Sequence, residues 1–128
     1  MAQDDLVIDP WGSAQSTDYD RIIDQFGLTS MERVELRSPS KLHRRGIVFA
    51  HRDVDQVLEA QRTGNDFGVL TGLMPSGQMH LGHSMVVEQA RWFQQQGGDV
   101  TIAVADLESQ ATRGVSLAKG RSIALEEY

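Results

Sequence analysis

The segment Pro75-Ser-Gly-Gln-Met-His-Leu-Gly-His83 constrains the fold more than any other part of this chain. It follows an apolar run, Phe67–Thr71, that predicts a strand, and it precedes a stretch with helical periodicity. A helix that begins at the histidines presents unpaired backbone N–H groups and a positive dipole end to anions. Gly82 allows a ligand to approach the backbone closely, and His80 and His83 can donate hydrogen bonds to phosphoryl oxygens. The segment therefore predicts a phosphate-binding loop between a strand and a helix.

From residue 66 onward the apolar pattern alternates between strands and helices. Val100–Ala105 is a nearly continuous apolar run, as expected of a parallel strand covered on both faces. Gly97-Gly98 ends the helix before it, and Ser116 is a candidate N-cap for a last helix that reaches Tyr128. The positions expected to face the core in the first helix are Met85, Val86, Ala90 and Phe93. This order predicts the α/β fold class, a Rossmann-like parallel sheet with the ligand loop at the carboxyl ends of its strands.

Two parallel strands are visible after residue 66, and most sheets have more. We therefore expect the chain to be the first part of a longer protein. Residues 66–128 would then form the first half of a nucleotide-binding catalytic domain, incomplete at its C-terminus.

Residues 1–65 predict a mainly helical N-terminal extension. The first 17 residues have the composition of an extended arm. Asp18–Phe26 has helical spacing and is followed by glycine, and Gly46–Ala50 predicts a short strand. Asp53 is the expected cap of a further helix that ends before Gly64.

The composition excludes several classes of partner and of site. With a formal net charge of −6, the chain lacks the broad basic footprint of a nucleic-acid-binding domain. No apolar stretch approaches the ~20 residues needed to span a bilayer, and the acidic N-terminus lacks the features of a signal peptide. The absence of cysteine excludes disulfides and thiolate metal sites. We expect a cytoplasmic protein with no membrane contact.

The histidine pair has two other interpretations. His80 and His83 share a helix face, so they could cap or pack locally, or share a metal ion. A metal site lacks a convincing third ligand nearby, and we predict none. Because a strand, Gly72, the Pro75-Ser-Gly turn, the histidines, a helix and a second strand occur in this order, the nucleotide interpretation is favoured.

The loop resembles the His-x-Gly-His motif of class I aminoacyl-tRNA synthetases, which is preceded in that family by Pro-Ser-Gly. Together with the run Val-Ala-Asp-Leu-Glu108, it agrees in outline with the tyrosyl and tryptophanyl enzymes. The segments that look like archaeal and eukaryotic tryptophanyl-tRNA synthetases are Ile8–Gly12, Asp18-Tyr-Asp20, Ile23–Gly27 and His43–Asp53. The resemblance extends from about Ile8 to Tyr128. A tyrosyl enzyme, another nucleotidyl transferase and a non-catalytic synthetase-derived binding module are the alternatives.

The resemblance implies ATP-dependent activation of tryptophan to tryptophanyl-adenylate, followed by transfer to tRNA(Trp). Mg²⁺ would accompany the ATP, tRNA would bind mostly through parts outside this chain, and the intact protein would be a homodimer. The family's Lys-Met-Ser-Lys-Ser loop is not in this sequence, so the 128 residues are expected to be inactive alone.

The resemblance also implies roles for individual residues. The positions that match the ATP site are Gly72, Pro75, Ser76, Gly77, His80, Gly82 and His83, and the two histidines would be catalytic. Glu108 matches a position that contacts tryptophan, although it also reads as an exposed acid at a helix start. Leu70 stands where an aromatic residue is common, and Ala103 stands where glutamine is common. At these two positions the chain departs from the pattern of the eukaryotic enzymes.

Overall fold

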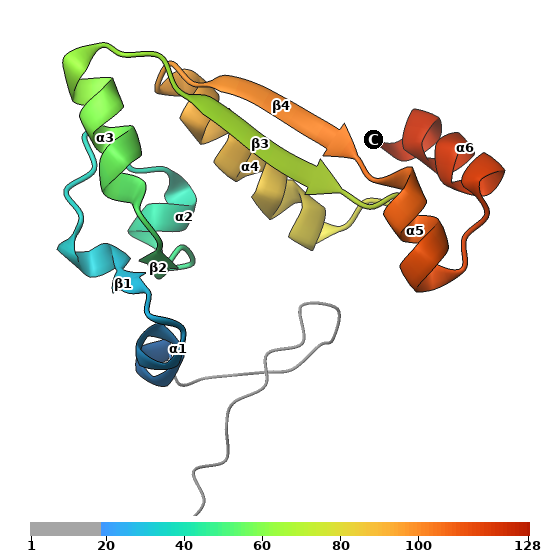
Figure 1. Ribbon diagram of the computed structural model, residues 1–128, viewed down its shortest axis with the longest axis horizontal. Coiled ribbons are helices and arrows are strands. Elements are labelled where there is room, and N and C mark those ends of the chain that lie inside the picture. The colour runs from blue at the N-terminus through green and yellow to red at the C-terminus, as the bar shows by residue number, and fades with distance from the viewer. Residues whose placement is uncertain (1–18) are drawn as a thin grey trace, which may run out of the picture. The chain divides into compact units, whose positions relative to one another are not determined.

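A computed structural model describes residues 19–128 of the chain (Figure 1). It comprises two compact units, an N-terminal unit, Met1–Val54, and a C-terminal unit, Asp55–Tyr128, which are described in turn. The predictions for the N-terminal arm, including Ile8–Gly12 and Asp18, lie outside the described residues.

The N-terminal unit begins with helix α1, Tyr19–Phe26, as the spacing predicted. Gly27 ends the helix in the left-handed conformation at φ 59°, where a side chain would be strained. Strands β1, Thr29–Ser30, and β2, Ala50–His51, pair antiparallel, and a short 3₁₀ helix (η1, Met31–Arg33) follows β1.

The strand predicted over Gly46–Ala50 is wrong for most of its length. Helix α2, Lys41–Arg44, ends in a turn in which the N–H groups of Ile47 and Val48 donate to the carbonyl of Leu42. Because these N–H groups close the helix, they are not available to a strand partner, and pairing begins only at Ala50.

Helix α3, Val54–Thr63, is capped differently from the prediction. Asp53 has a φ of 58°, an uncommon backbone conformation for a non-glycine residue. The N–H of Val54 donates to Nδ1 of His51 at 3.2 Å, so a histidine two positions before Asp53 takes the capping role. The end before Gly64 is confirmed, since Gly64 is left-handed at φ 72°.

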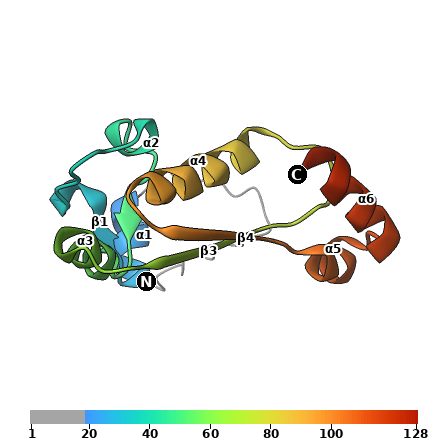
Figure 2. The same ribbon diagram turned by 90° about the horizontal axis from the view of Figure 1, so that it is seen from above.

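The C-terminal unit is built on two parallel strands, β3, Gly68–Leu73, and β4, Asp99–Val104. Helix α4, Leu81–Gln95, connects them and lies along the sheet (Figure 2). Helices α5, Asp106–Arg113, and α6, Leu117–Glu127, follow β4 and pack against each other. The predicted α/β fold is confirmed, and so is Ser116 as the cap of α6, because its Oγ accepts from the N–H of Lys119 at 3.3 Å.

Two details of this unit differ from the prediction. The sequence suggested one helix after β4, whereas the chain forms two, which are separated by the left-handed Gly114. The expectation that β4 is covered on both faces is also wrong in the described part of the chain. Thr101 and Ala103 are exposed on the same face as Leu70, and Ile102 and Val104, on the other face, are 41% and 43% exposed.

The core of the C-terminal unit lies under α4. Of the predicted stripe, Ala90 is buried and the other members are half-buried. Trp92, which the stripe omitted, is 5% exposed and meets the ring of Phe93 edge-on at 4.8 Å. Among the described residues, no helix is both long enough and apolar enough to cross a membrane.

Candidate functional site

The predicted phosphate loop connects β3 to α4 at the carboxyl end of the parallel sheet. His80 is the N-cap of α4, with extended backbone angles, and its Nδ1 accepts from the N–H of Gly82 at 3.2 Å. The imidazole therefore folds back over the first helical turn. A Cβ on Gly82 would lie 3.0 Å from Cε1 of His80, a tight contact that the imidazole would have to shift slightly to relieve.

His83 completes a reciprocal cap. Its Nδ1 accepts from the backbone N–H of His80 at 3.2 Å, and the centroids of the two imidazoles are 4.0 Å apart. Burial lowers the pKa of His83, and the nearby charge of His80 lowers it further. Both effects favour the neutral form of His83. The capping interpretation of the pair and the nucleotide interpretation are compatible, because the cap fixes where each ring points.

Tyr128 is a member of this cluster that sequence reasoning missed. Its hydroxyl lies 3.0 Å from Nε2 of His83 and donates to the carbonyl of Met74 at 3.2 Å. The rings of Tyr128 and His83 meet edge-on, with centroids 5.3 Å apart. The residue follows α6, distant in sequence from the loop, and no local pattern links it to the histidines.

Helix α5 anchors the loop from a second direction. The hydroxyl of Ser109 is fully buried and donates to the carbonyl of Pro75 at 3.0 Å. The side chain of Thr112, one turn further along the helix, contacts the sulfur of Met74 at 3.3 Å. Pro75 is itself fully buried. The turn that opens the predicted phosphate loop is thus fixed by side chains from α5, which the sequence did not indicate.

Replacing Ser109 by alanine is expected to lower the free energy of unfolding by about 1–3 kcal/mol, because the buried carbonyl of Pro75 loses its donor. Denaturant titration of the full-length gene product followed by circular dichroism measures this loss. Gln110→Ala, at an exposed position of the same helix, serves as the control and should change little. Equal stability of the two variants would contradict the anchoring role.

The remaining predicted ATP residues line the same loop. Ser76 is exposed and Gly77 is half-buried, and both lie between β3 and the cap of α4. Gly72 is exposed on β3 and pairs in register with Ala103 of β4. A Cβ on Gly72 would lie 3.7 Å from the carbonyl of Ala103, which is an ordinary contact, so packing does not demand glycine there.

The three residues assigned to the amino-acid side lie on β3, β4 and α5. Leu70 is 76% exposed on β3, and Ala103 is exposed on β4. Because side chains alternate along a strand and Gly72 pairs with Ala103, Leu70 and Ala103 lie on the same face. Glu108 is half-buried in the first turn of α5. Its place at a helix start agrees with the second interpretation, whereas the exposure which that interpretation expected is wrong.

The described residues do not gather metal ligands. Within residues 19–128, no group of three or more His, Cys, Asp or Glu side chains is arranged to hold a metal ion.

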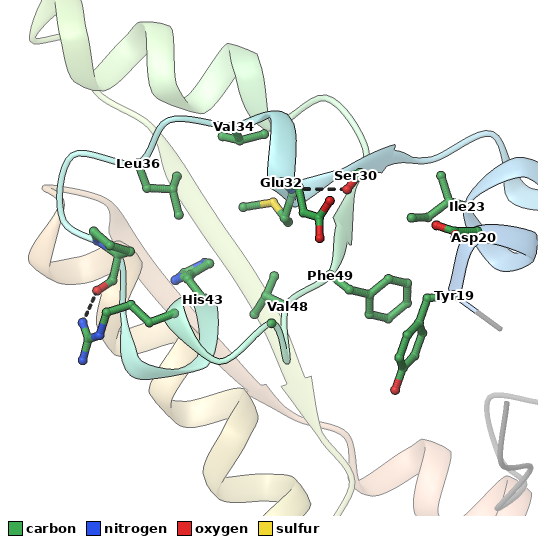
Figure 3. A pocket seen from close by; sticks show the side chains of 14 residues that line it. Tyr19, Asp20, Ile23, Ser30, Glu32, Val34, Leu36, His43, Val48 and Phe49 are labelled. Carbon is green, nitrogen blue, oxygen red and sulfur yellow. Dashed lines mark hydrogen bonds between the residues drawn. The ribbon is translucent and has the colours of Figure 1, made fainter. Parts of the chain in front are cut away.

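A separate pocket of about 540 Å³ lies in the N-terminal unit (Figure 3). Its walls include the rings of Tyr19 and Phe49, which are tilted by 35° with centroids 4.5 Å apart, and the imidazole of His43. Nδ1 of His43 bonds to the N–H and hydroxyl of Ser40 in a cap of the same kind as the one at α4, and burial lowers the pKa of His43. None of the predicted ATP residues lines this pocket.

A parallel strand–helix–strand unit with a loop and helix cap at the carboxyl end of the sheet is the arrangement of a Rossmann-type fold. The family model described as tRNA synthetases class I (W and Y) matches residues 61–127, and the chain belongs to this family. This confirms the class of enzyme that the histidine motif indicated.

The relatives are tryptophanyl enzymes. The chain is 44% identical to the tryptophan–tRNA ligase of Methanosarcina acetivorans over 126 residues, covering 97% of this chain and 29% of the relative. Tryptophan–tRNA ligase 1 of Halobacterium salinarum is 44% identical over 118 residues, 91% of this chain and 23% of the relative. The crystal structure of tryptophanyl-tRNA synthetase from Aeropyrum pernix superposes with a TM-score of 0.79 at 44% identity, covering 94% of this chain and 35% of that one. The chain thus spans about a quarter to a third of the length of these relatives.

Proposed function

We propose that the protein activates tryptophan with ATP and transfers it to tRNA(Trp). The observation that carries the proposal is 44% identity to tryptophan–tRNA ligases, together with a histidine-capped loop at the carboxyl end of the sheet. A solved relative from Encephalitozoon cuniculi, with a TM-score of 0.72 and 28% identity, is described as bound to tryptophan. In the reaction, the carboxylate of tryptophan attacks the α-phosphate of ATP, pyrophosphate leaves, and the acyl group then passes to the terminal adenosine of the tRNA.

Catalysis by this chain would be positioning and electrostatic stabilisation. Nδ1 of His80 accepts from the N–H of Gly82 in the helix cap, so the ring has its N–H donor at Nε2. The side chain is exposed, and this N–H is the donor we assign to the phosphoryl oxygens of ATP. His83 is assigned to the same step through His80, because its Nδ1 accepts from the backbone N–H of His80 and its ring packs against that of His80. Gly72, Pro75, Ser76, Gly77 and Gly82 would form the surface on which the nucleotide lies.

The amino-acid side of the proposal uses the exposed face of the sheet. Leu70 and Ala103 offer small and apolar contacts on one face, where the flat indole of tryptophan would lie. An indole has one N–H donor, so a carboxylate such as that of Glu108 is a suitable acceptor.

Further features of the proposal come from the family resemblance. We take Mg²⁺ as part of the ATP substrate, and no step is assigned to it. With a net charge of −6 in this chain, tRNA would bind mostly through other parts of the protein. A cytoplasmic homodimer is the proposed state of the full-length gene product.

The test is amino-acid-dependent exchange of pyrophosphate into ATP by the full-length gene product, measured at several salt concentrations. Exchange with tryptophan and not with tyrosine is the expected result. Exchange with tyrosine alone would reassign the substrate, and no exchange from a folded protein would favour a non-catalytic binding module. The isolated 128 residues serve as a comparison and are expected to show no exchange.

A further inference from the structure

The cluster of Met74, His80, His83 and Tyr128 contains hydrogen bonds whose directions are fixed at both ends. The carbonyl of Met74 can only accept, so the hydroxyl proton of Tyr128 is committed to it. At the other end, the backbone N–H of His80 can only donate, so Nδ1 of His83 is an acceptor. A neutral imidazole with an acceptor at Nδ1 carries its proton on Nε2.

These two assignments fix the direction of the hydrogen bond between His83 and Tyr128. Nε2–H of His83 donates to the oxygen of Tyr128, 3.0 Å away, and that oxygen is free to accept because its own proton points to Met74. Each of the three donors, the N–H of His80, Nε2–H of His83 and the hydroxyl of Tyr128, therefore has one acceptor. Both ring nitrogens of His83 are therefore used within the protein, which sets His83 apart from His80.

We propose that Tyr128 is a positioning residue for adenylate formation and acts through the imidazole of His83; this inference rests on the proposed function. The hydroxyl holds the ring of His83 in place, and His83 in turn holds the N–H of His80 and packs against its ring. The result is a fixed orientation for the outward Nε2–H of His80. Outer partners that orient a functional imidazole commonly change activity without touching the substrate.

The test uses Tyr128→Phe in the full-length gene product. Phenylalanine keeps the ring that packs edge-on against His83 and removes only the hydroxyl. We expect kcat for tryptophan-dependent pyrophosphate exchange to fall about tenfold, with KM for tryptophan unchanged. Glu126→Gln, an exposed change near the end of α6, which Tyr128 follows, is the control and should leave kcat unchanged.

A double-mutant cycle separates positioning from a general structural effect. If Tyr128 acts through His83, then Tyr128→Phe should have no further effect on kcat in a His83→Asn background. The same fold loss in both backgrounds, or no loss in either, would overturn the proposal.

A spectroscopic readout does not depend on activity. Nitrogen NMR of histidine-labelled protein should show His83 with its proton on Nε2 and protected from solvent exchange, and this protection should disappear in Tyr128→Phe. No exchange by the unaltered protein would refute the proposed function, and the NMR signal would then report separately whether Tyr128 holds His83. An unprotected Nε2–H in the unaltered protein would overturn the inference itself.

Discussion

The variant His80→Asn of the full-length gene product is expected to form tryptophanyl-adenylate about 10²- to 10³-fold more slowly, the usual cost of removing one donor aimed at a developing charge. Asparagine is among the best N-cap residues, so its side chain can still accept from the N–H of Gly82. The start of α4 would be kept, whereas the outward Nε2–H would be lost. The measurement is kcat for tryptophan-dependent pyrophosphate exchange, with thermal unfolding recorded on the same samples.

His80→Ala provides the matched comparison. It removes the donor and the cap together, so it should lose as much activity as His80→Asn and also about 1 kcal/mol of stability. Agreement of the two variants in kcat, with a difference in melting temperature, would assign the catalytic loss to the imidazole N–H. An asparagine variant with unchanged kcat would leave His80 with a capping role alone.

The elements that carry strong periodicity were predictable from the sequence. The strands around Val69 and Val100 and the helix that follows the histidines came from apolar patterns, and each is within two residues of its predicted start. The segment after Gly46 was not predictable, because its N–H groups are consumed by the turn that closes α2. The cap of α3 was misassigned since histidine is a rare cap and aspartate a common one.

The candidate site also has a part that the sequence predicted and a part that it did not. The residues of the loop are contiguous in sequence, so the motif located them together. Ser109 and Tyr128 reach the loop from elements that follow β4, and their partners are the backbone carbonyls of Pro75 and Met74. Every residue has a backbone carbonyl, so the sequence does not indicate which carbonyl accepts a hydrogen bond from a distant side chain. Such contacts can be identified only once the fold is known. The roles assigned to Leu70, Ala103 and Glu108 stay predictions.

Trp92→Ala is expected to have the largest effect on stability. The side chain is 5% exposed on α4, which packs against β3 and β4, and its ring contacts that of Phe93. Truncation of a buried tryptophan removes apolar burial and leaves a cavity, at a cost of about 3–5 kcal/mol in the free energy of unfolding.

Trp92→Phe should cost less stability because phenylalanine fills part of that volume. Arg91→Ala, an exposed neighbour on the same helix, should stay within about 0.5 kcal/mol of the unaltered protein. Denaturant titration followed by circular dichroism of the full-length gene product compares the three.

The position of Trp92 also separates stability from catalysis. It is about 18 Å along α4 from His80 at 1.5 Å per residue, so it does not touch the cap. At low temperature, where most molecules are folded, Trp92→Ala should keep its rate of pyrophosphate exchange per folded molecule. On heating, Trp92→Ala should lose its activity at a lower temperature than His80→Asn does. His80→Asn should have a low rate at every temperature at which it is folded. Loss of exchange in Trp92→Ala while the protein is still folded would show instead that packing under α4 sets the geometry of the histidines.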